Sequence, residues 1–336
     1  MNSTPARMDR ILCPTDFSAF SVQSLAHAVT LARTSHARVK VVHVIANIGP
    51  GVESVYGGAP WLLSDDDRRR IDEEMRGFVQ PLREAGVDHE VEIREGEPWR
   101  EIAAAAAQMQ ADLVVLGTHG RGGLNHLFLG SVAEKLIRKL PTPVLTVCHE
   151  DARPSEAPRD PLARILCATD FSEMSREALR MAAGLALEHQ SALTLLHVVE
   201  DMPDLSAAAH RGIVDMDVLR QALERSALER LLKLEADLGI KEIRIEPRAV
   251  VGVAYKEILR VASLERADLI VIGAQGHGFL EHLLSGSNAQ HVIRRAPCPV
   301  LTVRRVGVRD EGRKAAAAVG VAAERIDHDE GQGGER

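Results

Sequence analysis

The sequence predicts an α/β fold made of two doubly wound domains, each with a five-stranded parallel sheet in the order 3-2-1-4-5. The chain of 336 residues repeats itself almost completely, because RILCPTDFS (10–18) returns as RILCATDFS (164–172) and PTPVLTV (141–147) returns as PCPVLTV (297–303). Within each copy, short apolar runs rich in β-branched residues alternate with segments of helical periodicity. This alternation is typical of a parallel sheet with helices on both faces.

The repeat also sets the expected domain boundaries. We expect a first domain over 1–148, a linker over 149–162, a second domain over 163–305 and a tail over 306–336. Each copy, at about 150 residues, has the usual size of one domain. The linker is polar and rich in proline. The tail ends in the polar sequence DHDEGQGGER, so we predict that the tail is disordered.

The order of strands and helices is expected to be the same in both copies. In the first copy, strands are expected at 10–14, 38–45, 89–95, 112–117 and 144–148, and helices at 20–34, from Ser64 or Asp65 to before Gly86, from Pro98, and from Ser131. In the second copy, strands are expected at 164–168, 192–199, 243–250, 268–273 and 299–304. Pro98 suits the first turn of a helix, and Gly86 suits a helix C-terminus.

Two helices have a predicted apolar face. The first helix would bury Val22, Leu25, Ala26, Val29 and Ala32. The second helix of the second copy would bury Leu219, Leu223, Ala227, Leu231, Leu234 and Leu238 before Gly239 ends it.

A glycine-rich pattern, Gly-x2-Gly-x9-Gly-Ser, occurs once in each copy. Its residues are Gly117, Gly120, Gly130 and Ser131 in the first copy and Gly273, Gly276, Gly286 and Ser287 in the second. An apolar strand precedes each loop and a helix follows it. Since the N–H groups at a helix N-terminus bind anions, this arrangement indicates a phosphate site.

Polar residues after the first strand of each copy are expected to share a crevice with these loops. In a doubly wound sheet, ligands bind beyond the carboxyl ends of the strands where the winding reverses, and here the first and fourth strands meet at that point. Asp16 and Asp170 suit ribose hydroxyls or an adenine amino group. Val44 and Val198, at the end of the second strand, would form a wall for adenine and offer backbone hydrogen bonds.

Purely structural roles stay open for some of these residues. A strand-end aspartate could cap the following helix, and a serine before a helix is usually an N-cap. His119, His126, His277 and His282 lie in the two loops, but their spacing matches no familiar helical zinc motif, so we expect no metal site. The chain lacks the P-loop pattern, which argues against a P-loop ATPase. It also lacks a G-x-G-x-x-G after its first strand and a G-x-S-x-G between a strand and a helix, which argues against a dinucleotide-binding Rossmann site and an α/β-hydrolase.

Composition excludes several function classes. The net charge is −7 and 3% of residues are aromatic, which argues against a nucleic-acid partner. No apolar run approaches the ~20 residues of a membrane span, and the first residues lack the apolar region of a signal peptide, so we expect a cytoplasmic protein without membrane contact. Cys13, Cys148, Cys167 and Cys298 include no C-x-x-C pair, and reduced buried thiols are expected.

With these motifs in place, the chain resembles a tandem universal stress protein of the ATP-binding type. The resemblance rests on PTDFS and ATDFS, on both glycine loops, and on the PTPVLTV and PCPVLTV endings, and it covers about 10–148 and 164–305. It implies a fold of the adenine-nucleotide α-hydrolase-like type and ATP as ligand. ADP or AMP stays open as the bound nucleotide, and so does an accompanying Mg²⁺.

The resemblance also implies two sets of nucleotide-binding residues. The first set is Pro14, Thr15, Asp16, Val44, Gly117, Gly120, Gly130, Ser131 and Val132, to which we add Arg121 as a neighbour of the phosphates. The second set is Ala168, Thr169, Asp170, Val198, Gly273, Gly276, Gly286, Ser287 and Asn288. The two sets differ in residue type at two positions, with Ala168 in place of Pro14 and Asn288 in place of Val132.

The expected function is ATP binding in stress response or signalling, through nucleotide-dependent conformation or contacts with an unknown protein partner. A scaffold or chaperone-like protein with a structural nucleotide site is the alternative. We expect no catalytic residues, although slow ATP hydrolysis or autophosphorylation stays open. A receiver-type phospho-switch is disfavoured, because the third strand ends at Glu95-Gly96 where a receiver needs an acceptor aspartate.

The fifth strands are expected to mediate assembly. VLTV at 144–147 and 300–303 is an apolar edge that invites pairing, so we expect an intrachain pseudo-dimer in which cysteines at Thr146 and Thr302 would couple, with a homodimer left open.

The two sites are expected to be unequal. Arg121 corresponds to His277 and Asn125 to Glu281, so the first loop should attract triphosphate more strongly than the second.

Overall fold

The computed structural model describes residues 8–46, 64–118, 129–147, 162–200, 215–274 and 287–304. The expected loop at 47–60, the tail at 306–336 and all of the linker except Leu162 lie outside these residues.

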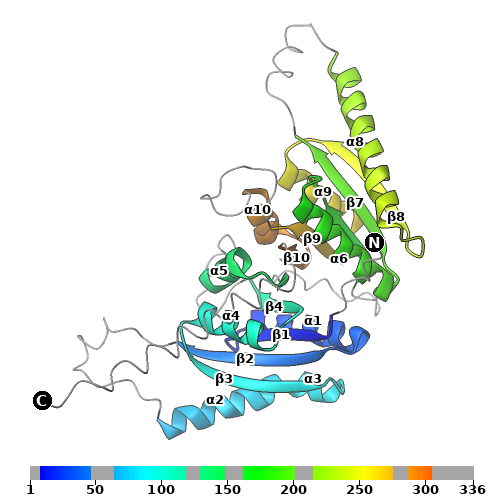
Figure 1. The fold of residues 1–336 in the computed structure, drawn as a ribbon. Coiled ribbons are helices and arrows are strands. Elements are labelled where there is room, and N and C mark those ends of the chain that lie inside the picture. Colours follow the sequence, from blue (N-terminus) through cyan, green and yellow to red (C-terminus); the bar gives the residue numbers. More distant parts are fainter. Residues whose placement is uncertain are drawn as a thin grey trace, which may run out of the picture. The chain divides into compact units, whose positions relative to one another are not determined.

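Strands and helices alternate along each half of the chain (Figure 1). The first half contains β1 (Arg10–Thr15), α1 (Ala19–Ser35), β2 (Arg38–Ala46), α2 (Asp65–Phe78), α3 (Gln80–Glu84), β3 (His89–Gly96), α4 (Pro98–Gln108), β4 (Leu113–Gly117), α5 (Ser131–Lys139) and β5 (Val144–Val147). The second half contains β6 (Arg164–Ala168), α6 (Glu173–His189), β7 (Ala192–Val199), α8 (Met216–Leu238), β8 (Ile245–Val251), α9 (Ala254–Glu265), β9 (Leu269–Gly273), α10 (Ser287–Arg295) and β10 (Val300–Val303).

The strand order confirms the predicted fold class. The sheet runs β3-β2-β1-β4-β5-β10-β9-β6-β7-β8, which is the order 3-2-1-4-5 followed by its mirror image. All pairs within each half are parallel, and only β5 and β10 pair antiparallel. Each half is therefore a doubly wound domain with β1 or β6 at its centre.

Successive strand residues face two separate cores. In β1, Ile11 and Cys13 belong to the core that Leu25 of α1 also joins, whereas Leu12 faces the core that contains Leu136 of α5. Strands buried on both faces need continuous apolar runs, which is why the central strands carry almost no polar residues.

The central cysteines are part of this core. Cys13 and Cys167 are buried and reduced, and burial raises the pKa of each thiol to about 12. Both thiols therefore stay protonated at neutral pH and act as small apolar side chains.

The helix after β2 differs from the prediction. A single helix was expected up to Gly86, but α2 ends at Phe78 and the short α3 follows it. Pro81 lies in the first turn of α3 and has no N–H to continue the α2 hydrogen bonds, so the helix breaks at Val79.

The predicted face of α1 is wrong in part. Val22 is 53% exposed and Ala26 is also exposed, whereas Ser21 and Ser24 are buried. Ser24 tolerates burial because its hydroxyl donates to the Phe20 carbonyl at 2.8 Å.

The predicted face of α8 is also wrong in part. Leu219 and Leu223 are only half-buried, whereas Ala227, Leu231 and Leu234 are fully buried.

The fifth strands pair within one chain, as predicted. Leu145 lies opposite Leu301, and the hydroxyls of Thr146 and Thr302 donate to the carbonyls of Val300 and Val144 at 3.1 and 3.0 Å. These reciprocal bonds give the pairing a pseudo-two-fold character.

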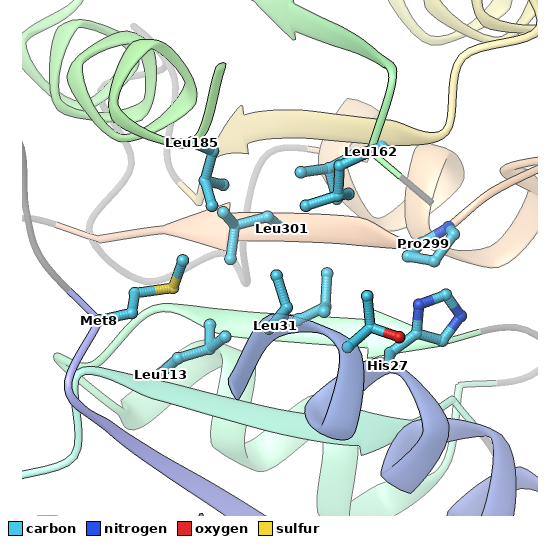
Figure 2. Close-up of a pocket in the computed structure, with 11 residues that line it drawn as sticks. Met8, His27, Leu31, Leu113, Leu162, Leu185, Pro299 and Leu301 are labelled. Atoms are coloured by element: carbon cyan, nitrogen blue, oxygen red, sulfur yellow. The ribbon is translucent and has the colours of Figure 1, made fainter. Parts of the chain in front are cut away.

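Apolar side chains from both halves surround this pairing (Figure 2). They enclose a cavity of about 20 Å³ and come in pairs that the repeat relates, namely Met8 with Leu162, Leu31 with Leu185, Leu113 with Leu269 and Leu145 with Leu301. His27, Thr30 and Pro299 complete the lining. A cavity this small has room for about one water molecule, and its apolar lining offers few polar partners for one.

The register moves the expected cross-link from Thr302 to Val300. Cysteines replacing Thr146 and Val300 should form an intrachain disulfide on mild oxidation, because directly opposed residues have Cβ atoms about 5 Å apart. The Thr146 and Thr302 pair is offset by two positions and serves as the matched control, with diagonal neighbours about 7–8 Å apart. Non-reducing electrophoresis measures both, and faster coupling of the offset pair would contradict the register.

Candidate functional site

The central strands of the first half separate at their carboxyl ends. β1 pairs with β4 only at Ile11–Leu113 and Leu12–Val114, although both strands continue beyond these pairs. In the second half, pairing of β6 with β9 ends at Cys167–Val271. These are the points where the winding reverses, which is where doubly wound sheets bind ligands, so we use the term crevice for the region beyond the carboxyl ends of the central strands in each half.

The second strand of each half runs past the end of the central strand. β1 pairs with β2 only as far as His43, whereas β2 continues beside β3 to Ala46. In the second half, the Thr169 N–H donates to the Leu196 carbonyl at 2.8 Å, so the backbone of Leu196 faces the central strand. Because backbone groups alternate along a strand, Val198 presents its N–H and C=O to the same side, beyond the last β6–β7 pair at Ala168–Leu196.

A tight turn follows the central strand. Thr15 is buried, and its Oγ1 accepts the Phe17 N–H at 2.9 Å while Phe17 takes a left-handed φ of 61°. The second half repeats this turn, with a Phe171 φ of 64° and a 3.1 Å bond from its N–H to Thr169 Oγ1. A bulky residue rarely adopts this conformation, so the surrounding contacts must hold it.

Asp16 organises the start of α1. Its Oδ1 accepts the Ser18 N–H at 3.0 Å and the Ser21 hydroxyl at 2.5 Å, and Asp170 accepts the Ser172 N–H at 3.0 Å. The true N-caps are Ser18 and Ser172, so the capping role considered for the aspartates falls mainly to these serines. Both aspartates are half-buried and lie just after the ends of β1 and β6.

Two histidines missed as site residues fix these turns. His43 Nδ1 lies 2.9 Å from the Thr15 carbonyl and its ring stacks on Phe17 at a centroid distance of 4.5 Å. His197 lies 2.7 Å from the Thr169 carbonyl, with its ring 4.3 Å from that of Phe171. The signal was present in the sequence, since His-Val and Asp-Phe-Ser both recur in the second copy.

The helix after the first glycine loop begins without a side-chain cap. Gly130 is the N-cap of α5, so Ser131 is the first helical residue and does not cap the helix. The Gly130 N–H donates to the Thr118 carbonyl at 2.7 Å and closes the base of the loop. The first N–H groups of α5 thus have no side chain bonded to them as a cap, which leaves a helix start of the kind that binds anions.

Gly273 is required by a close approach rather than by an unusual φ. A Cβ at this position would lie 3.2 Å from the backbone carbon of Met174 and the backbone nitrogen of Ser175. Both neighbours belong to the first turn of α6. The end of β9 therefore packs directly on the start of that helix.

Replacing Gly273 with alanine should destabilise the fold by roughly 1–3 kcal/mol, because the backbone of α6 must shift. Gly77→Ala is the matched control, since a Cβ on Gly77 within α2 meets nothing within 4 Å and alanine is the better helix former. Urea unfolding should show opposite signs for the two variants. Equal free energies of unfolding for Gly273→Ala and the parent would contradict the close approach.

In the second half, a cation contacts the aromatic pair formed by Phe171 and His197. The Arg230 guanidinium of α8 lies 3.8 Å from the centre of the Phe171 ring, whereas Phe78 packs edge-on against Phe17 in the first half. Burial lowers the pKa of His197 and Arg230 lowers it further, while the bond to Thr169 and the charge of Asp170 act in the opposite direction. His197 thus favours the neutral form.

This pKa direction predicts an acid-dependent loss of stability. As the pH falls below about 6.5, the unfolded state takes up a proton that folded His197 resists, so the free energy of unfolding should fall until the folded pKa is reached. His197→Gln should lose less stability than the parent between pH 7.5 and 5. Urea unfolding at several pH values measures this, and parallel curves for the two proteins would contradict it.

The structure describes most of the predicted site residues and places them at or next to the carboxyl ends of strands, or at the starts of the helices that follow. In the first half these are Pro14, Thr15, Asp16, Val44, Gly117, Gly130, Ser131 and Val132, and in the second half Ala168, Thr169, Asp170, Val198, Gly273 and Asn288. Gly120, Arg121, Gly276 and Gly286 lie outside the described residues, as do the loop histidines. Ser287 begins α10, but its side chain is not described.

Membrane-spanning helices and metal-binding clusters are both absent from the described residues. None of their helices is both long and apolar enough to cross a membrane. They also contain no group of three or more His, Cys, Asp and Glu side chains placed to hold a metal ion.

The fold and the paired crevices define a class of tandem α/β proteins with one crevice per domain. The model of the Universal stress protein family matches residues 8–147 and 162–304. The chain belongs to the universal stress protein family.

Relatives match either both halves of the chain or one half. A universal stress protein of Mycobacterium tuberculosis is 26% identical over 312 residues, covering 90% of this chain and 99% of the relative. One from Methanocaldococcus jannaschii is 35% identical over 138 residues, covering 41% of this chain and 81% of its own. The crystal structure of a universal stress protein from Archaeoglobus fulgidus matches 88% of this chain and 98% of its own with a TM-score of 0.63 and 23% identity, which supports the fold.

Proposed function

We propose that the chain binds adenine nucleotides in its two crevices, with ATP as the main ligand. The observation that carries this proposal is the backbone edge at Val44 and Val198, beyond the last pairing with the central strand. Adenine carries a hydrogen-bond donor and a hydrogen-bond acceptor along one edge. The backbone C=O and N–H of Val44 or Val198 can bond to these two groups. The half-buried valine side chains supply an apolar wall beside it.

The remaining parts of a nucleotide find suitable groups nearby. The carboxylates of Asp16 and Asp170 can accept ribose hydroxyls. The uncapped start of α5 offers N–H groups to phosphate oxygens, and Ser131 adds an exposed hydroxyl. ADP and AMP would use a part of the same contacts, and Mg²⁺ would accompany the triphosphate.

Membership of the universal stress protein family supports a role in stress response. Within that role, we propose that nucleotide occupancy changes the conformation of the chain or its contacts with a protein partner in the cytoplasm. No general base or arginine clamp for phosphoryl transfer is assigned, so the proposal is a binding function rather than an enzyme activity.

Titration calorimetry with ATP, ADP and AMP, with and without Mg²⁺, tests the proposal. We expect saturable binding of ATP, and no binding of any of the three would overturn it. Pulldowns with and without ATP then separate a nucleotide-regulated protein from a scaffold, because identical partner sets would favour the scaffold.

A further inference from the structure

A side-chain contact crosses the mouth of the second crevice. Asn288, the second residue of α10, donates from Nδ2 to Oε1 of Glu200 at 3.4 Å, and Glu200 directly follows β7. In the sheet, β6 lies between β9, which precedes α10, and β7. The contact therefore joins the two walls of the crevice past the end of β6.

Among the described residues, the first crevice has no counterpart to this contact. By the repeat, Asn288 corresponds to Val132 and Glu200 to Ala46. Val132 packs against the core, and Ala46 is the exposed last residue of β2. Neither side chain carries a polar group, so at these two positions the crevices differ by a carboxylate and the amide bonded to it.

This carboxylate would face the phosphates of a nucleotide. Asn288 holds Glu200 beside the start of α10, where the helix dipole and N–H groups favour negative charge. A phosphate chain that approaches the same helix start meets the negative charge of Glu200. The repulsion grows with each phosphate that the ligand carries.

The nucleoside part of a ligand would meet no such penalty. Glu200 directly follows β7 and comes two residues after Val198 of the proposed adenine wall. A carboxylate after the second strand of a doubly wound sheet can accept hydrogen bonds from ribose hydroxyls. The same residue can thus favour the sugar while it disfavours the phosphates.

We infer that Glu200, positioned by Asn288, makes the second crevice selective for adenosine or AMP over ATP, whereas the first crevice binds ATP. This inference rests on the proposed function, since it assigns different ligands to the two proposed sites. The earlier argument for unequal sites used Arg121 and Glu281, which lie outside the described residues. The contact between Asn288 and Glu200 supports inequality independently.

The experiment compares two single-site proteins. Gly286→Val leaves the first crevice intact and Gly130→Val leaves the second, and each is titrated with adenosine, AMP and ATP. We expect the ratio of the ATP to the adenosine dissociation constant to be roughly tenfold higher at the second crevice. The difference should narrow as salt screens the charges.

Reciprocal variants isolate the carboxylate. Glu200→Gln keeps an oxygen for Asn288 and for a ribose hydroxyl but removes the charge, so it should tighten ATP at the second crevice and change adenosine affinity far less. Ala46→Glu combined with Val132→Asn should weaken ATP at the first crevice. Glu188→Gln, on the exposed end of α6, removes an equal charge away from the crevice and is the matched control.

The outcomes separate this inference from the proposed function. If both single-site proteins ranked the three ligands alike, or if Glu200→Gln left ATP affinity unchanged, the inference would be wrong and nucleotide binding would stand. If neither protein nor the parent bound any of the three ligands, the proposed function would fail and this inference with it.

Discussion

Gly130→Val should weaken ATP binding at the first crevice by roughly 5- to 150-fold, which corresponds to about 1–3 kcal/mol. The branched side chain would occupy the space in front of the first N–H groups of α5, where the phosphates are proposed to lie. The backbone tolerates valine, because Gly130 has a φ of −57° and a ψ of 141° and needs no left-handed conformation. The fold should therefore survive.

The measurement is calorimetric titration of ATP in a Gly286→Val background, so that only the first crevice contributes. Thermal melting of the same proteins controls for folding. An unchanged dissociation constant together with normal melting would remove Gly130 from the site. A lowered melting temperature without a change in affinity would make its role structural.

Leu301→Asp should destabilise the chain by about 3–5 kcal/mol, because it places a carboxylate at a position that is 2% exposed. Leu301 lies opposite Leu145 and lines the apolar contact between the halves (Figure 2). Val91→Asp on the edge strand β3 is the control. Val91 is 42% exposed, so the same substitution there should change the free energy of unfolding by less than about 1 kcal/mol.

A double-mutant cycle separates the pairing of β5 with β10 from simple burial. Leu145→Ala and Leu301→Ala should be non-additive by about 0.5–3 kcal/mol, because the two residues are partners in register. Urea unfolding of the four proteins gives the coupling. Strict additivity, or equal effects of Leu301→Asp and Val91→Asp, would contradict contact between the halves.

The architecture follows from the sequence because it depends on repeated, local patterns. Apolar runs such as ADLVVLG and ADLIVIG predict buried parallel strands, and their alternation with helices sets the strand order. The apolar face of α1 was harder to predict. The Ser24 hydroxyl donates to a backbone carbonyl of its own helix, so Ser24 can be buried while Val22 is exposed. The break after α2 depends on Pro81, a single residue inside an otherwise helical pattern.

Some features of the candidate site could likewise be predicted from the sequence, and others could not. Asp16, Val44 and Gly130 could be placed together, since the carboxyl ends of neighbouring strands share one edge of the sheet. The stack of His43 on Phe17 could not, because it needs a left-handed φ that an aromatic residue rarely adopts. The contact of Glu200 with Asn288 joins residues 88 positions apart, and no local pattern reports it.

Mass spectrometry of the small molecules released from freshly purified protein tests the central proposal most directly. The proposed function predicts an adenine nucleotide, in an amount that falls when Gly130→Val and Gly286→Val are combined. If no adenine nucleotide were released and added ATP also failed to bind, nucleotide binding in these crevices would be contradicted. Release of equal amounts from the parent and the double variant would place the nucleotide elsewhere on the chain.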